Sequence, residues 1–213
     1  MIVIKIMPAI KQDGIFSFHY FLFSYGKYHN NGVNQALHMV FIPLILFSGF
    51  TLLCNYAPWV DLGVELPLIG NMFNLIGLYL FINDIVYFLV EPLIGLIFTI
   101  WSTGVIVLGQ HLWQHKEDFT LTVGDHTYSM MYWMTVLHVF SWIAQFYGHG
   151  VHEKRAPALL TNLLFANLAP FFVIFEILNG CFGYKEGPEM DKVRVAIEED
   201  IRDYHAPKKN KTQ

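Results

Sequence analysis

The segment from Gln145 to Pro157 carries the residues of this chain that are best suited to chemistry. It ends a stretch rich in Trp, Met and Phe, and it places His149 and Glu153 four positions apart. If a helix continues through it, Gln145, His149 and Glu153 form one polar stripe on a single face. Imidazole and carboxylate groups are metal ligands, so the stripe is a candidate metal site at the mouth of an apolar helix.

Two cations, Lys154 and Arg155, follow this stripe directly. Either could neutralise a fatty acid carboxylate or a lipid phosphate, because ammonium and guanidinium groups pair with both anions. The pair is also typical of the positive flank of a membrane span, which requires no substrate. The sequence leaves both interpretations open.

A second polar cluster precedes the first long apolar run. Asn30-Asn31-Gly32 indicates a turn, which frees His29 and His38 from the opposite faces that one unbroken helix would give them. Asn34 is predicted at the cap or first turn of the next helix, where it shares a face with His38. One histidine at the mouth of a membrane helix is more often hydrogen-bonded than metal-bound, but two beside another cluster favour a metal.

The composition is typical of a membrane protein. Of the 213 residues, 54% are hydrophobic and only 14% are charged, against roughly 25% charged in an ordinary soluble domain. The net charge of -4 and the lack of a long basic stripe argue against a nucleic acid partner. The two cysteines, Cys54 and Cys181, have no metal or redox spacing, so histidine and carboxylate are the available ligands.

Four or five apolar runs are long enough to enter a membrane. Residues 36–56 carry no charge, and residues 66–110 carry only Asp84 and Glu91, which allows two spans of ~20 residues with a turn at Glu91-Pro92. Residues 130–147 and 159–179 supply two more runs, the last of which is interrupted by polar residues and could be a re-entrant hairpin. We predict an all-α fold, a polytopic membrane helical bundle with four or five membrane segments.

The charges that flank these runs predict the topology. Lys5, Lys11 and Lys27 precede the first span, whereas the loop 55–65 has acidic residues alone, so the N-terminus should be cytosolic. Four crossings then return His149 to the side of the N-terminal cluster, which predicts a metal site at the cytosolic face. We expect residues 1–184 to form the membrane-embedded domain and residues 185–213 a polar C-terminal helix and a basic tail. The spacing of Val193, Ile197 and Ile201 predicts one apolar face on this helix.

A rival histidine pair, His111 and His115, lies at the end of another apolar run, with Glu117 and Asp118 nearby. Their spacing of four also places two imidazoles on one helical face. The predicted topology puts this pair on the other side of the membrane from His149. We therefore do not expect it to share a metal with the other histidines.

Taken together, the clusters resemble those of the Mpo1-like family of endoplasmic reticulum 2-hydroxy fatty acid dioxygenases. The resemblance covers most of residues 25–178. Three motifs carry it: Tyr28-His29-x4-Asn34-x3-His38-x4-Pro43-Leu44-Ile45-Leu46-Phe47-Ser48-Gly49, Trp142-x2-Gln145-Phe-x-Gly148-His149-Gly-Val-x-Glu153-Lys154-Arg155-x-Pro157-Ala158-Leu159-x2-Asn162-Leu163, and Ala169-Pro170-Phe-x3-Phe175-Glu176.

The resemblance implies an Fe(II)-dependent, oxygen-using enzyme of the endoplasmic reticulum membrane. Such an enzyme shortens a 2-hydroxy fatty acid by one carbon during degradation of phytosphingosine-type sphingoid bases. The family's polar positions fall on His29, His38, His149 and Glu153, which would hold iron, with Glu153 either as a fourth ligand or as an orienting group. The residues expected to contact the substrate are Lys154, Arg155, Asn34 and Gln145, and membrane lipids would surround the bundle.

Two other classes of protein remain open at this point. A di-iron membrane hydroxylase or desaturase would also use cytosolic histidine clusters, but about eight histidines in paired groups would be expected, and this chain has only His149-x-x-His152-Glu153 of that kind. A lipid-binding membrane scaffold without enzymatic activity would keep the apolar bundle and the basic flanks, yet would not need its histidines to converge.

Overall fold

Long helices form almost all of the structure, a computed structural model that describes residues 17–53, 75–157 and 167–206. The predicted all-α class is confirmed. The elements are α2 (Phe18–Gly26), α3 (Gly32–Leu53), α4 (Leu75–Val90), α5 (Pro92–Gln114), α6 (Met130–Tyr147), the π-helix η1 (Gly148–Glu153), α8 (Ala169–Phe182) and α9 (Pro188–His205). A small antiparallel hairpin, which the sequence analysis did not predict, joins α5 to α6 and consists of β1 (Leu121–Val123) and β2 (His126–Tyr128).

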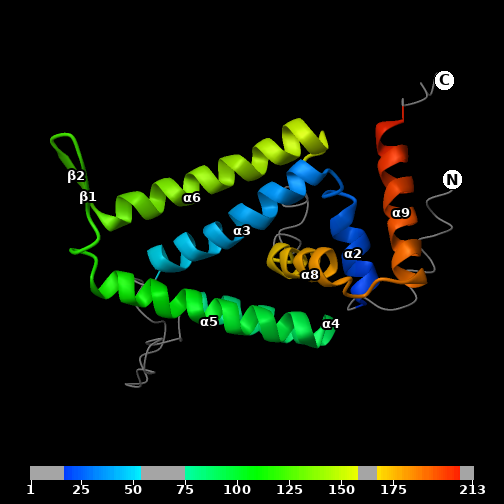
Figure 1. The fold of residues 1–213 in the computed structure, drawn as a ribbon, viewed down its shortest axis with the longest axis horizontal. Coiled ribbons are helices and arrows are strands. Elements are labelled where there is room, and N and C mark those ends of the chain that lie inside the picture. Colours follow the sequence, from blue (N-terminus) through cyan, green and yellow to red (C-terminus); the bar gives the residue numbers. More distant parts are fainter. Residues whose placement is uncertain (1–16, 54–74, 158–166, 207–213) are drawn as a thin grey trace.

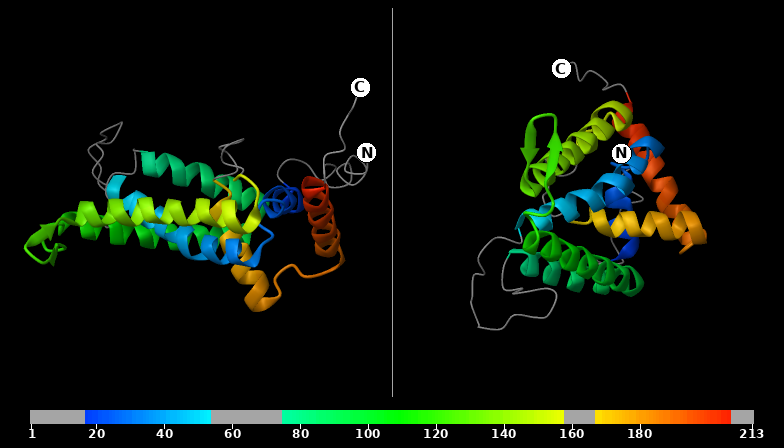
Figure 2. Two further views of the ribbon diagram at one scale, coloured as in Figure 1. Left: turned by 90° about the horizontal axis from the view of Figure 1, so that it is seen from above. Right: turned by 60° about the vertical axis from the view of Figure 1, so that its left-hand side comes forward.

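The long helices pack in two pairs, α3 with α6 and α4 with α5. Figure 2 shows both pairs, and α3 also contacts α5 and α8, which joins them into one bundle. The start of α3 and the end of α6 meet beside α2, whereas the hairpin lies at the other end of the long helices (Figure 1). The bundle therefore has two distinct ends, and residues from both polar clusters of the sequence come to the same one.

The predicted turn between the two spans of residues 66–110 is confirmed. Glu91 is extended, with φ of -156°, and Pro92 is the first residue of α5, where a missing N–H costs nothing. Thr99 donates a hydrogen bond to Asp84 at 2.8 Å, which links α5 to α4 and gives the half-buried Asp84 side chain a partner. Tyr184, just after α8, donates to Glu91 at 2.7 Å and ties the next segment to the turn.

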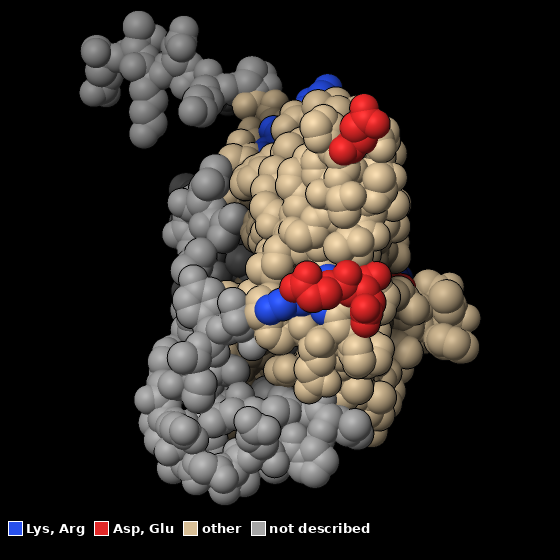
Figure 3. Space-filling view, turned by 90° about the vertical axis from the view of Figure 1, so that its left-hand side faces the viewer, with Lys and Arg blue, Asp and Glu red and all other residues tan. Residues whose placement is uncertain are grey.

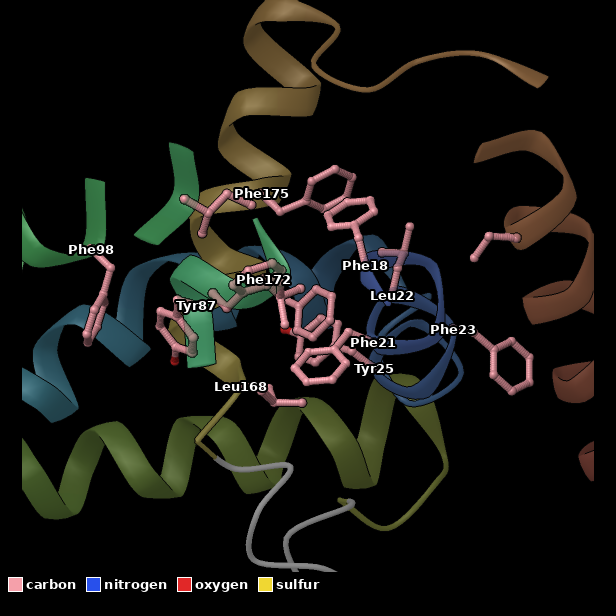
Figure 4. Packing of buried hydrophobic residues seen from close by; sticks show 14 of the residues in the cluster. Phe18, Phe21, Leu22, Phe23, Tyr25, Tyr87, Phe98, Leu168, Phe172 and Phe175 are labelled. Carbon is pink, nitrogen blue, oxygen red and sulfur yellow. The ribbon is translucent and has the colours of Figure 1, made fainter. Parts of the chain in front are cut away.

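Aromatic side chains of α2, α4, α5 and α8 form the centre of the core (Figure 4). Phe18 of α2 contacts Phe175 of α8 with ring centroids 5.1 Å apart, and Tyr87 of α4 contacts Phe98 of α5 at 4.7 Å. Burial of large aromatic side chains is a main stabilising contribution in any core. This core lies directly under the end of the bundle that carries His29, so it supports the polar residues there.

The C-terminal helix α9 packs against α2 (Figure 1). The predicted apolar stripe is confirmed, because Val193 and Ile197 are buried and Ile201 packs at the edge of the core. The side chain of Ile197 lies so close to Gly26 that a Cβ at position 26 would collide with it. The basic tail predicted to follow α9 lies outside the described residues.

Two described helices, α3 and α5, are long and apolar enough to cross a membrane, whereas α4 and α8 are apolar but shorter. Only 28% and 33% of the residues in the most apolar stretches of α3 and α5 are buried within the protein. Large apolar side chains also face outward from α4, α5 and α6, among them Phe81, Leu89, Ile100, Phe140 and Ile143. Seen from the hairpin end, the surface is mostly uncharged, with charged side chains in small groups (Figure 3).

Candidate metal centre

The helix that carries the second polar cluster does not keep one geometry to its end. It is α-helical to Tyr147 and continues as the π-helix η1, so the regular stripe predicted for Gln145, His149 and Glu153 is wrong beyond Gln145. Gly148 lies against the Asn34 side chain, and a Cβ there would collide with it, so glycine permits the close approach of α6 and α3. Single π-helical turns of this kind are rare and frequent at functional sites.

Three histidines from separate parts of the chain meet at this end of the bundle. His29 lies between α2 and α3, His38 in α3 and His149 in η1, and their ring centroids are 4.4 to 4.9 Å apart. One ligand nitrogen from each lies within 4.8 Å of the others, so the three could hold a metal ion. Their exposed fractions are 7%, 4% and 4%, so the imidazoles are almost fully removed from water.

Backbone carbonyls orient two of the three rings. The Nδ1 of His29 donates to the Tyr25 carbonyl at 3.0 Å, and the Nδ1 of His38 donates to the Asn34 carbonyl at 2.8 Å. With the proton on Nδ1, each Nε2 carries a lone pair, and these two atoms face one another at 3.1 Å. A bound cation relieves this repulsion, and carbonyl-oriented imidazoles are typical metal ligands.

The electrostatics of the cluster also favour a cation over protons. Burial, together with the neighbouring His38 and His149, lowers the pKa of His29 well below its ordinary value. Burial lowers the pKa of His149 to about 4, although Glu153 opposes the shift. The Nδ1 of His149 is buried and has no hydrogen-bond partner within the part of the chain that the structure describes. Neutral imidazoles are the form that binds metals, so the residues present fit a metal ion.

Glu153 is bound by backbone donors and does not belong to the group of ligand atoms that converge with the three histidines. Its carboxylate accepts hydrogen bonds from the N–H groups of Asn30 and Asn31 at 3.0 to 3.2 Å, and from the Asn34 amide at 3.2 Å. These contacts hold the turn after His29 and the first turn of α3 against η1. Of the two roles predicted for Glu153, the contacts favour the orienting one.

Arg155 and Lys154 are not brought together with the histidines. The Arg155 guanidinium donates to the Lys27 carbonyl and to Asp200 of α9, both at 2.7 Å, and it lies over the rings of Tyr28 and Tyr204. Lys154 is exposed and adopts a left-handed conformation, with φ of 53°, that ends η1. The predicted pairing of either cation with a substrate carboxylate is therefore not supported, because one is already occupied and the other points into solvent.

The two amides predicted to contact a substrate lie in different surroundings. Asn34 is fully buried and donates to Glu153 and to the Tyr28 carbonyl, so it belongs to the framework of the site. Gln145 lines a cavity of about 220 Å³ together with the three histidines. Its Nε2 donates to the Leu37 carbonyl at 3.4 Å, but its buried Oε1 has no hydrogen-bond partner among the described residues. Gln145 thus combines a place on the wall of this cavity with a carbonyl oxygen that none of the described residues binds.

The rival pair lies far from this centre, as predicted. His111 and His115 occupy the end of α5 next to the hairpin, at the opposite end of the long helices (Figure 1). Both are exposed, their ring centroids are 4.6 Å apart, and the Nδ1 of His115 lies 3.5 Å from Asp118. No third ligand joins them among the residues that the structure describes.

Two features of the site were missed from the sequence. Tyr25 stacks flat on His29, with ring centroids 3.7 Å apart, and is itself stacked on Phe172. Its spacing of four from His29 was the available signal. The contact of Asp200 and Tyr204 with Arg155 joins α9 to the site, and no local pattern predicted it, because the residues lie 45 and 49 positions further along the chain.

Comparison with known proteins identifies the family. A family model described as 2-hydroxy-palmitic acid dioxygenase Mpo1-like matches residues 15–182, which include all three histidines and Glu153. The 2-hydroxy-palmitic acid dioxygenase of Saccharomyces cerevisiae is 30% identical over 179 residues, which are 83% of this chain and 85% of the yeast protein. No solved structure matches significantly. The chain therefore belongs to the Mpo1-like family.

Proposed function

We propose that this protein is a membrane-bound dioxygenase that uses Fe(II) and oxygen to shorten 2-hydroxy fatty acids by one carbon. The observation that carries the proposal is the group of three buried, converging histidines in a chain of this family. Imidazoles alone suit several transition metals, so the choice of iron rests on the family and on the oxygen chemistry. Bound iron would supply the activation of oxygen.

The overall chemistry requires no further reductant. A 2-hydroxy acid that becomes the acid one carbon shorter, with carbon dioxide and water, gives up the same number of electrons that one oxygen molecule takes up. A plain fatty acid would have to lose two more electrons to reach the same product. The 2-hydroxyl therefore matters for the electron balance as well as for recognition, which favours a site that discriminates strongly for it.

Residues of the histidine cavity are placed to recognise the two polar groups of such a substrate. The unpartnered Oε1 of Gln145 can accept a hydrogen bond from the 2-hydroxyl. A site built to bond a hydroxyl rejects the analogue without it, because a buried acceptor then stays unpaired. None of the described residues that line this cavity is Lys or Arg. A buried carboxylate without a cation is costly, so we expect the acid to bind only when the histidines hold a metal.

The surroundings of the helices support a location in the membrane. Many large apolar side chains of α4, α5 and α6 face outward, and exposed apolar surface of this kind is expected where helices contact lipid. We propose that α4 and α6 join α3 and α5 in the endoplasmic reticulum membrane, with the histidine end toward the cytosol. The substrate would then arise in the membrane during degradation of phytosphingosine-type sphingoid bases.

The test is a turnover assay on detergent-purified protein with metal analysis. We expect about one iron per chain, and oxygen-dependent conversion of 2-hydroxy-palmitic acid to the acid one carbon shorter, with little turnover of palmitic acid. Gln145→Leu should lose most of this preference while it keeps iron. Two irons per chain with a product of unchanged length would indicate a hydroxylase, and a folded protein without metal would indicate a scaffold.

A further inference from the structure

A second cavity adjoins the histidine cavity and shares part of its wall. It has a volume of about 200 Å³ and lies between α3, α5 and α8. Ile42 and Leu46 of α3 and Pro170 of α8 line both cavities. The two spaces are therefore adjacent along these residues, and the second one leads away from the histidines.

The described residues that line the second cavity carry no charged side chain and no hydroxyl or amide group. Besides the shared residues, aliphatic side chains and Trp101 make up most of the lining, with Ile97 on α5 and Val173 and Ile174 on α8. A surface of this composition offers no hydrogen bond to water and no charge to an ion, whereas burial of a hydrocarbon against it lowers the free energy. The cavity thus has the chemistry of an alkyl-chain site.

The spacing of the lining residues on α3 shows in which direction the cavities extend from the histidines. His38, Ile42 and Leu46 follow one another at intervals of four, so they form one stripe that extends about 12 Å along the helix from the histidines. On α8, Val173 is buried, whereas Ile177 at the far wall is 44% exposed. The inner end of the second cavity therefore meets the histidine cavity, and its outer end reaches the apolar surface of the bundle.

We propose that the second cavity holds the alkyl tail of the fatty acid whose carboxylate and 2-hydroxyl lie at the three histidines, and that the tail enters from the lipid at Ile177. This inference rests on the proposed function, because it assigns the tail of that substrate. Ile97, Trp101 and Ile174 then determine which chain lengths bind well. A void that packing left empty would have no influence on chain length, so the two explanations differ in a measurable way.

The first experiment narrows the cavity and compares two identical substitutions on α5. Ile97→Trp fills the second cavity, whereas Ile100→Trp adds the same volume at a position that is 66% exposed and lines neither cavity. Turnover of 2-hydroxy acids of increasing chain length is measured for both variants, together with their iron content and thermal stability. Because each buried methylene contributes about a fourfold factor in binding, we expect Ile97→Trp to lower the ratio of long-chain to short-chain kcat/KM more than tenfold. Ile100→Trp should keep the ratio of the unaltered protein.

The second experiment does not depend on turnover. A 2-hydroxy fatty acid with a photoreactive diazirine at the end of its chain is bound to the intact protein, irradiated, and its attachment sites are mapped. We expect labels on Ile97, Ile174 or Ile177 that unlabelled 2-hydroxy acid displaces. Labels confined to the outer face of α6, or equal chain-length ratios in Ile97→Trp and Ile100→Trp with iron retained, would overturn the tail site and leave the proposed function standing. Specific labels in the second cavity without any shortening of the acid would support the tail site and overturn the proposed function.

Discussion

The two ends of the bundle carry similar residues and differ in what surrounds them. At the hairpin end, His111 and His115 lie on one face of α5 with Asp118 close by, and all three are exposed. At the other end, His29, His38 and His149 come from separate parts of the chain and are buried. Both groups contain side chains that bind metals, but only in the second do backbone carbonyls orient two of the rings, those of His29 and His38.

This contrast shows which features distinguish a candidate metal centre from other groups of histidines. Two exposed histidines at a spacing of four can occur on any helix without a metal, because water can hydrogen-bond to both rings. Three imidazoles in a dry space lose their water, and the two Nε2 atoms that face one another at 3.1 Å have no proton between them. The arrangement is unfavourable alone and favourable around a cation, so burial and convergence are more informative here than spacing.

The largest expected effect comes from removal of a ligand. His29→Ala, His38→Ala and His149→Ala should each lose bound iron and all activity, because two remaining imidazoles do not hold the ion tightly. The matched control is His111→Ala or His115→Ala, and each of these variants should keep its bound iron and its activity. Metal analysis and turnover of the purified variants check this comparison. Iron retained in His149→Ala, or lost in His111→Ala, would reverse the assignment of the two ends.

The carboxylate behind the histidines should have a smaller effect. In Glu153→Gln an amide NH2 would oppose at least one of the backbone N–H groups of Asn30 and Asn31, so the turn after His29 would loosen. We expect iron affinity and kcat to fall by about 10- to 100-fold, as for other groups that orient ligands. Glu117→Gln, at the exposed hairpin end, is the control and should change neither the iron affinity nor kcat. A complete loss of iron in Glu153→Gln would instead indicate a direct ligand.

Arg155 tests whether α9 contributes to the site. Arg155→Ala removes the hydrogen bonds to the Lys27 carbonyl and Asp200 and the contacts with two tyrosine rings. Hydrogen bonds to a charged group contribute about 1.5–3 kcal/mol, so we expect a lower melting temperature and about tenfold weaker iron binding. Lys154→Ala alters the exposed residue next to Arg155 and should change neither the melting temperature nor the iron affinity. A raised KM with unchanged stability in Arg155→Ala would restore a direct role in substrate binding.

The smallest effect concerns pH. If the three histidines had ordinary pKa values near 6.5, protonation of each would lower the metal affinity about fivefold between pH 6.5 and pH 5.5, and the three together would lower it by about two orders of magnitude. Because burial lowers the pKa of His149 to about 4 and that of His29 well below its usual range, we expect iron affinity to change less than tenfold over that interval. Equilibrium binding of iron at several pH values checks this. A hundredfold loss by pH 5.5 would contradict the buried, neutral state of the rings.

The same shift predicts the behaviour of the metal-free protein. Between about pH 6.5 and about pH 4, the unfolded chain binds a proton at position 149 and the folded chain does not. The unfolded state is therefore favoured more as the pH falls through this window, and the protein without metal loses stability. Iron at saturating concentration should reduce this loss, because it binds the folded state alone.

Local patterns were sufficient to predict much of this protein. Uninterrupted apolar runs predicted α3, α5 and α6 nearly to their ends, because helix formation and burial both depend on side chains that are close in sequence. Proline at position 92 marked the turn between α4 and α5, and the spacing of Val193 and Ile197 predicted the buried face of α9. The motifs also led to the correct family, which the match over residues 15–182 shows.

The roles of individual polar residues depended on contacts that no local pattern contains. Glu153, Arg155 and Gln145 lie within one short segment, yet one holds backbone N–H groups, one is paired with α9, and one faces the histidine cavity. The sequence alone determined that these residues are polar, close to a helix end and near a histidine. Only the tertiary structure decided which of them lines the cavity beside the three histidines, because the π-helical turn begins at Gly148 and the partners come from distant parts of the chain.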